Sequence, residues 1–279
     1  MTYKTILTYL ASAERASTLI DVALAIARKQ EAHLIGLHVV PQVPVYGAVA
    51  AQIPQDVIDR QRDVMREDAE VMQKIFEDAT KGSEVQTEWR CVEAQYGDLA
   101  EDIVGQALSV DLVVAGQETT DWFEGRGELP ARIVMGSGRP VLLVPNEGKF
   151  NGVGERVVVA WNQSRESARA AFDALPLMQD AKSVRVLAVN PSNGQGHNVF
   201  SPSEDLALCL SRHGIQTEAA STVTSELSIG DELLSRLADY GSDLLVMGCY
   251  GHSRLRETIF GGATRHILKH MTVPVLMSH

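Results

Sequence analysis

A glycine-rich segment between residues 247 and 264 has the residue types and spacing to bind an anion. It begins Met247-Gly248-Cys249-Tyr250-Gly251-His252-Ser253-Arg254. Six residues later it ends with Gly261-Gly262-Ala263-Thr264. Glycine lets a backbone approach a ligand closely. A helix start offers free N–H groups and the positive end of the helix dipole. Because an apolar helical pattern follows Thr264, the segment predicts a cradle for phosphate, to which Thr264 adds a hydroxyl donor.

Charge and position bear on this interpretation. Arg254, Arg256 and Arg265 accompany the glycines, and only Glu257 opposes them. Two-glycine loops also occur as ordinary turns and helix starts, so the spacing alone leaves both interpretations open. What favours a nucleotide site is the place of the segment, which leaves a predicted strand and enters a predicted helix.

An internal repeat defines that place. Residues 109–116 (SVDLVVAG) recur at 241–248 (GSDLLVMG), and residues 141–144 (VLLV) recur at 275–278 (VLMS). The first copy is longer by about 18–20 residues, which lie between Pro41 and Gly97. Residues 146–154 are rich in glycine and asparagine and read as a linker. The sequence therefore predicts two domains, 1–146 and 154–279.

Strands alternate with helices in each copy. We expect strands near residues 3–9, 34–40, 85–92, 111–115 and 140–144, and again near 155–161, 184–190, 216–223, 243–247 and 273–277. Runs such as 111–115 lack polar alternation, which indicates burial on both faces. Helical periodicity covers 56–79, and Ala16, Leu19, Ile20, Ala23 and Ala27 share one helix face. The order predicts an α/β fold of two tandem, doubly wound, five-stranded parallel sheets, with ligands beyond the carboxyl ends of the strands.

The last strand of each copy would leave an apolar edge in a domain standing alone. Val141, Leu142 and Leu143 in one copy, and Val275, Leu276 and Met277 in the other, form these edges. We therefore expect the two domains to pack as a pseudo-dimer about a pseudo-two-fold axis through these strands. The competing interpretation is two independent domains on a flexible linker.

The pattern Gly-x2-Gly-x9-Gly at the exit of the fourth strand resembles the universal stress protein A family, and the tandem arrangement resembles its two-domain members. The resemblance covers nearly the whole chain and implies a Rossmann-like fold of the nucleotide-binding alpha hydrolase type. In ATP-binding members this motif wraps the ribose and phosphates. Gly248, Gly251, Gly261 and Gly262 match it. Gly262 stands where the family usually has Ser or Thr, so one hydroxyl contact is lost.

The resemblance places adenine and ribose beside the first strand of the second copy. Family members usually carry an acidic residue there, whereas this chain has Asn162, which hydrogen-bonds without charge. Asn162 or Ser164 could equally cap the following helix, and Val189, at the apolar adenine position, could equally be plain core. The implied cofactor-binding residues are Ala160, Trp161, Asn162, Ser164, Val189, Met247, Gly248, Gly251, His252, Ser253, Arg254, Gly261, Gly262, Ala263 and Thr264.

The first copy departs from the motif. Thr119 replaces the second glycine, and the helix-opening pair aligns with Leu129-Pro130, where proline offers no N–H. Acidic side chains nearby would repel phosphate: Glu118, Asp121, Glu124 and Glu128. We interpret this copy as degenerate, structural or differently liganded, with Trp122 and Phe123 flanking another ligand as the alternative.

Composition narrows the functional class. The net charge is −11, and residues 1–148 alone hold 13 basic and 23 acidic side chains. This acidity argues against nucleic acid as a partner, and no apolar run reaches the ~18–20 residues that span a bilayer. Three cysteines without a CxxC pattern indicate a reducing, cytoplasmic setting. His266 and His270 could bind zinc with Cys249 or His279, but histidines at a helix end also simply complement the dipole.

Together these features predict a cytoplasmic stress-response protein that binds ATP, with or without Mg, in its C-terminal domain. Hydrolysis would be slow or absent, because His252 is the only titratable group expected close to the phosphates and no catalytic residue or metal ligand is identified. The alternatives are a nucleotide-free interaction or chaperone-like pseudo-dimer, and a binder of another phosphorylated or acyl ligand under the apolar segment 44–54. A homodimer of chains stays open.

Overall fold

The computed structural model describes residues 2–41, 55–94, 98–117, 129–150, 152–191, 202–249 and 262–279. We call β1–β5 and their helices the first half, and β6–β10 with theirs the second half. The strands of the first half are β1 (Thr5–Tyr9), β2 (His33–Val40), β3 (Thr87–Glu93), β4 (Leu112–Gly116) and β5 (Val141–Val144). Those of the second half are β6 (Arg156–Ala160), β7 (Ser183–Val189), β8 (Thr217–Thr222), β9 (Leu244–Gly248) and β10 (Val275–Ser278).

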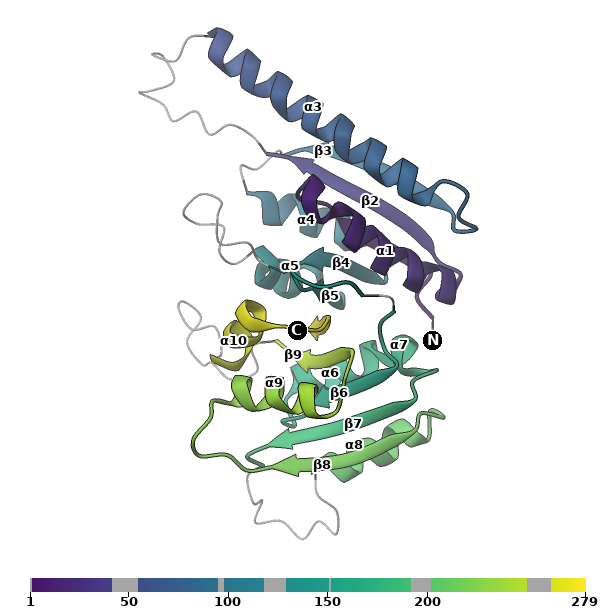
Figure 1. Ribbon diagram of the computed structural model, residues 1–279, viewed down its shortest axis with the longest axis vertical. Helices are drawn as coiled ribbons and strands as arrows, with labels where there is room; N and C mark the ends of the chain where they lie inside the picture. The colour runs from purple at the N-terminus through teal and green to yellow at the C-terminus, as the bar shows by residue number, and fades with distance from the viewer. Residues whose placement is uncertain are drawn as a thin grey trace.

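All ten strands belong to one sheet, in the order β3-β2-β1-β4-β5-β10-β9-β6-β7-β8. Neighbouring strands within each half run parallel. β5 and β10 run antiparallel, so the two halves join into one continuous mixed sheet (Figure 1). This arrangement confirms the predicted pair of doubly wound halves joined through their last strands, and it excludes two independent domains on a flexible linker.

Helices cover both faces of the sheet. The helices of the first half are α1 (Ala13–Gln30), α3 (Gln55–Thr80), α4 (Leu99–Ala107) and α5 (Leu129–Ser137). The second half has α6 (Arg165–Asp173), α7 (Leu175–Met178), α8 (Pro202–Ser211), α9 (Ile229–Asp239) and α10 (Gly262–His270). Apolar residues of α1, α3, α6, α7 and α8 form the core on one face, and those of α4, α5, α9 and α10 form the core on the other.

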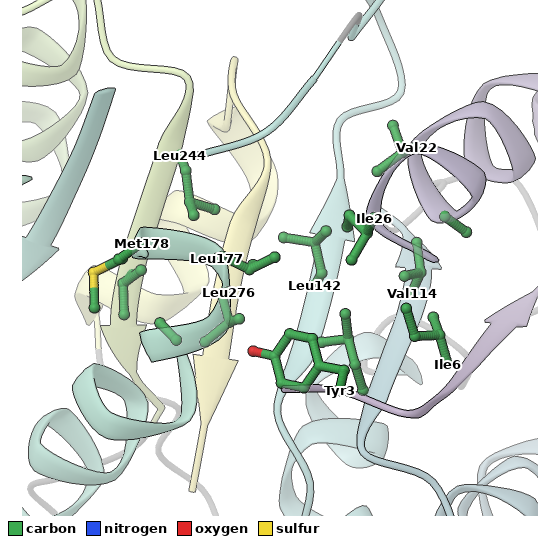
Figure 2. Packing of buried hydrophobic residues seen from close by; sticks show 14 of the residues in the cluster. Tyr3, Ile6, Val22, Ile26, Val114, Leu142, Leu177, Met178, Leu244 and Leu276 are labelled. Carbon is green, nitrogen blue, oxygen red and sulfur yellow. The ribbon is translucent and has the colours of Figure 1, made fainter. Parts of the chain in front are cut away.

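Each core runs without interruption through both halves. Figure 2 shows Leu142 of β5 and Leu276 of β10 side by side, with Ile26 of α1 beyond one and Leu177 of α7 beyond the other. The predicted face of α1 is buried as expected, including Ala16, Leu19, Ile20, Ala23 and Ala27. The continuous apolar run 112–115 is buried on both faces, as its lack of polar alternation predicts.

Polar contacts also cross between the halves beside this core. The Tyr3 hydroxyl donates across the junction to the Asp173 carbonyl at 2.5 Å, and within the second half the Ser278 hydroxyl donates to the carboxylate of the same Asp173 at 2.9 Å. The Gln30 amide donates to the Pro176 carbonyl at 3.0 Å. Burial, and secondly the charge of Asp173, raise the pKa of Tyr3 far above its usual value, so Tyr3 acts as a donor. Helix α1 is thereby tied to α7, and the segment before β1 to α6, of the other half.

Candidate functional site

The strand order of the second half reverses between β6 and β9, and the candidate site lies at the carboxyl ends of these two strands. Ala160 of β6 is paired in register with Met247 of β9. Ligands of doubly wound sheets bind where two neighbouring strands send their helices to opposite faces. The two predicted segments, 160–164 and 247–248, are therefore brought together, although they are more than eighty residues apart in the chain.

The segment after β6 is held by its own hydrogen bonds. The Trp161 amide donates to the Leu187 carbonyl at 2.8 Å, which extends the β6–β7 ladder. Asn162 Oδ1 accepts from the Ser164 amide at 3.1 Å, and Ser164 Oγ accepts from the Ser167 amide at 3.1 Å. Ser164 is therefore the N-cap of α6, one of the two alternatives that the sequence leaves open. Asn162 is exposed, and its engaged oxygen leaves its amide nitrogen as a donor.

Gly248 ends β9 in direct contact with the first turn of α6. A Cβ placed there would lie 2.3 Å from the Ser167 nitrogen and 2.4 Å from the Glu166 carbonyl carbon. Both distances are far below any van der Waals contact, so only glycine fits. The motif glycine thus has a packing role in this chain that the sequence pattern does not reveal. Gly116 occupies the same place in the first half, where a Cβ would meet only Leu19 Cδ1 at 3.9 Å.

Helix α10 begins at Gly262 and presents the described part of the predicted phosphate cradle. Among the described residues, a Cβ on Gly262 would meet nothing within 4 Å. Ala263 is half-buried, whereas Thr264 is only 4% exposed. Among the described residues no hydrogen bond engages the Thr264 hydroxyl. The other predicted cradle residues lie outside the described part of the chain: Gly251, His252, Ser253, Arg254 and Gly261.

Val189 ends β7 and lies at the edge of the core. It is half-buried and packs against the apolar cluster that α9 and α10 share. The following residue, Asn190, accepts a hydrogen bond from the Thr224 amide at 2.8 Å, which holds the exit of β7 to that of β8. A half-buried apolar side chain at this edge is compatible with both the core role and the predicted adenine contact.

The equivalent place in the first half holds a cavity of about 400 Å³. Leu129 and Pro130 open α5 and line it. Apolar Leu129 and Pro130 therefore stand at the start of α5, whereas the described part of α10 starts with Gly262 and Ala263. The segments 44–54 and 118–128, with Trp122 and Phe123, lie outside the described residues.

Two residues at these strand ends are not predicted by the sequence patterns. His38 lies near the end of β2 and lines the cavity of the first half. Gln117 follows β4, and its amide donates across the junction to the carbonyls of Leu268 and Lys269 at 2.8 and 3.0 Å. The only signal for either is position, because both stand where a buried strand reaches the carboxyl edge of the sheet.

The histidines of α10 have other partners than a metal. His266 Nε2 lies 2.9 Å from Asp231 Oδ1, and the ring centroids of His266 and His270 lie 4.6 Å apart with the ring planes tilted by 42°. The Ser228 hydroxyl first, and the two histidines next, hold the pKa of Asp231 below its usual value. His279 Nδ1 contacts the Cys249 carbonyl at 3.0 Å. Within the described ranges, no group of three His, Cys, Asp or Glu residues is placed to hold a metal ion.

Comparison with known proteins identifies a family for both halves. The model of the "Universal stress protein family" matches residues 2–145 and 154–279. A universal stress protein of Synechocystis sp., Slr1230, is 26% identical over 187 residues. That alignment spans 64% of this chain and 60% of the relative, which is less than two thirds of the relative's length.

One solved structure shares the fold over nearly the whole chain. A universal stress protein from Archaeoglobus fulgidus aligns with 98% of this chain and 95% of its own, with a TM-score of 0.71 at 15% identity. A universal stress protein in complex with cAMP aligns over its whole length with 53% of this chain, at 23% identity and a TM-score of 0.31.

In the described residues, no helix has the length and apolar character to cross a membrane.

Proposed function

The chain belongs to the universal stress protein family, and from this premise we propose that its second half, residues 154–279, binds ATP at the exits of β6 and β9. The first half, residues 1–146, then serves as the structural partner that completes the sheet. The site would hold the triphosphate at the start of α10 and the nucleoside along the ends of β6 and β7.

The observation that carries this proposal is the difference between the two helix starts. α10 opens with Gly262, beside which the described residues leave space, and with the buried residue Thr264, whose hydroxyl no described residue engages in a hydrogen bond. α5 opens with Leu129 and Pro130, and proline has no N–H to offer an anion. A phosphate would gain backbone donors and dipole stabilisation at α10 that α5 cannot supply in the same way.

The nucleoside would meet the residues that follow β6 and end β7. Trp161 is half-buried with its indole nitrogen free of hydrogen-bonding partners in the described residues, so it can donate to a ligand. Asn162 offers an amide donor for the ribose, because its oxygen is held by Ser164. Val189 supplies an apolar contact for adenine. The carboxylate that family members usually place after the first strand is replaced by Asn162, so we propose storage or sensing of ATP with slow hydrolysis at most.

Calorimetric titration of the full chain with ATP, with and without Mg, tests the proposal. We expect one site per chain. Thr264→Val removes one hydroxyl and should weaken binding about five- to tenfold, whereas Gly261→Val, by filling the space of the phosphates, should abolish it. Thr272→Val, at an exposed position two residues beyond the end of α10, is the matched control and should bind as the wild type does.

The outcomes separate the alternatives. Two equivalent sites would show that the first half binds nucleotide as well, against the assignment to α10. Absence of binding at millimolar ATP would favour the nucleotide-free interaction module. Unchanged affinity of Gly261→Val would place the phosphates elsewhere. The cytoplasmic location stays a prediction from composition.

A further inference from the structure

The cavity of the first half has the character of a small-molecule site. Its volume of about 400 Å³ lies within the range of ~300–1,000 Å³ that ligand pockets occupy. It lies at the exits of β1, β2 and β4, where the strand order of the first half reverses. α3 closes one side with Met72, and α5 closes another with Ile133.

The described residues of the wall are mostly apolar. Leu19, Val39, Met72, Leu99 and Ile133 contribute to it. Arg15 also lines the cavity, but its guanidinium donates to the Pro145 carbonyl, which holds it at the rim. Asp68 lines it from the exposed side of α3. A mostly apolar wall with few convergent polar groups is typical of sites for apolar ligands.

His38 is the buried polar group of this wall. His38 is only 7% exposed, and its Nδ1 lies 2.8 Å from the Leu10 carbonyl oxygen. A carbonyl only accepts, so Nδ1 carries the proton and Nε2 of the neutral ring is an acceptor. In the described part of the chain, Nε2 has no hydrogen-bonding partner. A donor on a molecule bound in the cavity would pair with this acceptor.

The same cavity is poorly suited to phosphate. Pro130 removes a backbone donor from the first turn of α5, and Leu129 covers that turn. Asp68 adds a negative charge at the rim, and the surrounding residues 1–148 carry ten more acidic than basic side chains. An anion would be repelled where an uncharged ring would bury apolar surface.

We propose that the first half binds a small, mostly apolar molecule with one hydroxyl donor, which His38 Nε2 accepts. The molecule fills the space between α3 and α5 at the ends of β1, β2 and β4. The site is separate from the proposed ATP site, and neither requires the other. One chain would then hold two ligands of opposite polarity at equivalent places in its two halves.

The probe pair 2-naphthol and 2-methoxynaphthalene tests this proposal on the full chain. Both are apolar bicyclic rings of similar size, and only 2-naphthol donates a hydrogen bond. Fluorescence titration should give one saturable site for 2-naphthol, with affinity about five- to tenfold above that for 2-methoxynaphthalene. Equal affinity for both probes would overturn the role of His38, and failure of either to saturate would overturn the site.

Variants locate the binding. His38→Phe keeps a ring and removes the acceptor, so it should lower 2-naphthol affinity to that of the methoxy probe while leaving the latter unchanged. Leu129→Trp places a larger side chain in the cavity and should weaken both probes at least tenfold. His33→Phe, on the same strand but at its opposite end beside Glu88, is the matched control and should bind as the wild type does.

His38 also bonds the Leu10 carbonyl, so each variant is compared by circular dichroism with the wild type. If His38→Phe does not fold, Leu129→Trp still tests whether the probes bind in this cavity, and the probe pair still tests whether a hydroxyl donor strengthens binding. Displacement of 2-naphthol by ATP would show that nucleotide occupies the first half and would overturn the separation of the sites. Saturable binding that ATP leaves unchanged supports the proposal whether or not ATP binds the second half.

Discussion

Leu142 and Leu276 lie opposite each other where β5 and β10 pair. On either side of this pair, Val141 lies opposite Met277 and Leu143 lies opposite Val275. Leu142 thus pairs with its own repeat equivalent, whereas Val141 pairs with the equivalent of Leu143, and Leu143 with the equivalent of Val141. The pseudo-two-fold axis passes through the Leu142–Leu276 pair. Both side chains are fully buried, and the junction of the halves is a continuation of their cores.

Shortening the two leucine side chains at this axis should destabilise the whole chain. Leu142→Ala and Leu276→Ala should each lower the free energy of unfolding by about 2–5 kcal/mol, because each leaves a cavity that neighbouring strands fill only in part. The double variant should cost less than the sum, since the two residues share one contact. Chemical denaturation measures this. Leu108→Ala, at a position 57% exposed, is the control, and equal stability of Leu142→Ala and Leu108→Ala would contradict the expectation.

A second prediction concerns the first half alone. Residues 1–146 would expose β5, whose side chains are buried in the full chain and whose backbone groups pair with β10. An apolar strand edge invites pairing with another copy, so the isolated half should self-associate or aggregate. Light scattering beside the full chain at equal concentration measures this. A stable, well-folded monomer of 1–146 would show that the junction adds little to its stability.

Gly116 and Gly248 occupy equivalent strand ends, and we expect opposite tolerance to alanine. Gly248→Ala drives a methyl group into the Ser167 backbone and should cost several kcal/mol, on the order of a severe overpacking change. Gly116→Ala meets a side-chain methyl at an ordinary contact distance and should change stability by less than about 1 kcal/mol. Thermal denaturation distinguishes the two, and similar melting temperatures would refute a packing role for Gly248.

Acid should weaken α9 through Glu232. The Thr222 hydroxyl, 2.7 Å away, and then the Arg236 guanidinium, 2.8 Å away, hold the pKa of Glu232 below its usual value. A lowered pKa in the folded state means that this contribution is present above the unfolded value, about 4.3, and is lost as pH falls through the folded pKa. Glu232→Gln should therefore flatten the decline of stability between neutral and acidic pH. Glu70→Gln, exposed on α3, is the control, and a wild-type decline in Glu232→Gln would contradict the assignment.

The sequence predicts the strands well because buried parallel strands are continuous apolar runs. All ten expected strands occur within a few residues of their predicted ends, and the amphipathic pattern of 56–79 gives helix α3 (Gln55–Thr80). The pairing of the two halves through β5 and β10 is predicted from the apolar last strand of each copy alone. The short helix α7 (Leu175–Met178) is not predicted, because four residues are too few for a periodic pattern.

The candidate site is predicted less completely, for a physical reason. Residue types and strand ends identify segments 160–164 and 247–248, and the register of β6 and β9 brings them together. Whether Gly248 faces a ligand or a helix depends on how closely α6 approaches β9, which no local pattern encodes. The cavity beside His38 depends on where α3 crosses the sheet, so the sequence offers only a lone histidine in an apolar strand.

Gln117 makes the two halves unequal partners. Its amide belongs to the first half but caps the C-terminal carbonyls of α10, the helix whose other end we assign to phosphate. The equivalent residue in the second half is Cys249, whose buried side chain has no amide to offer. A symmetric assembly of two second halves would therefore leave the Leu268 and Lys269 carbonyls without this donor. The two halves are therefore not exchangeable at their junction, because the first supplies the amide that holds the end of α10.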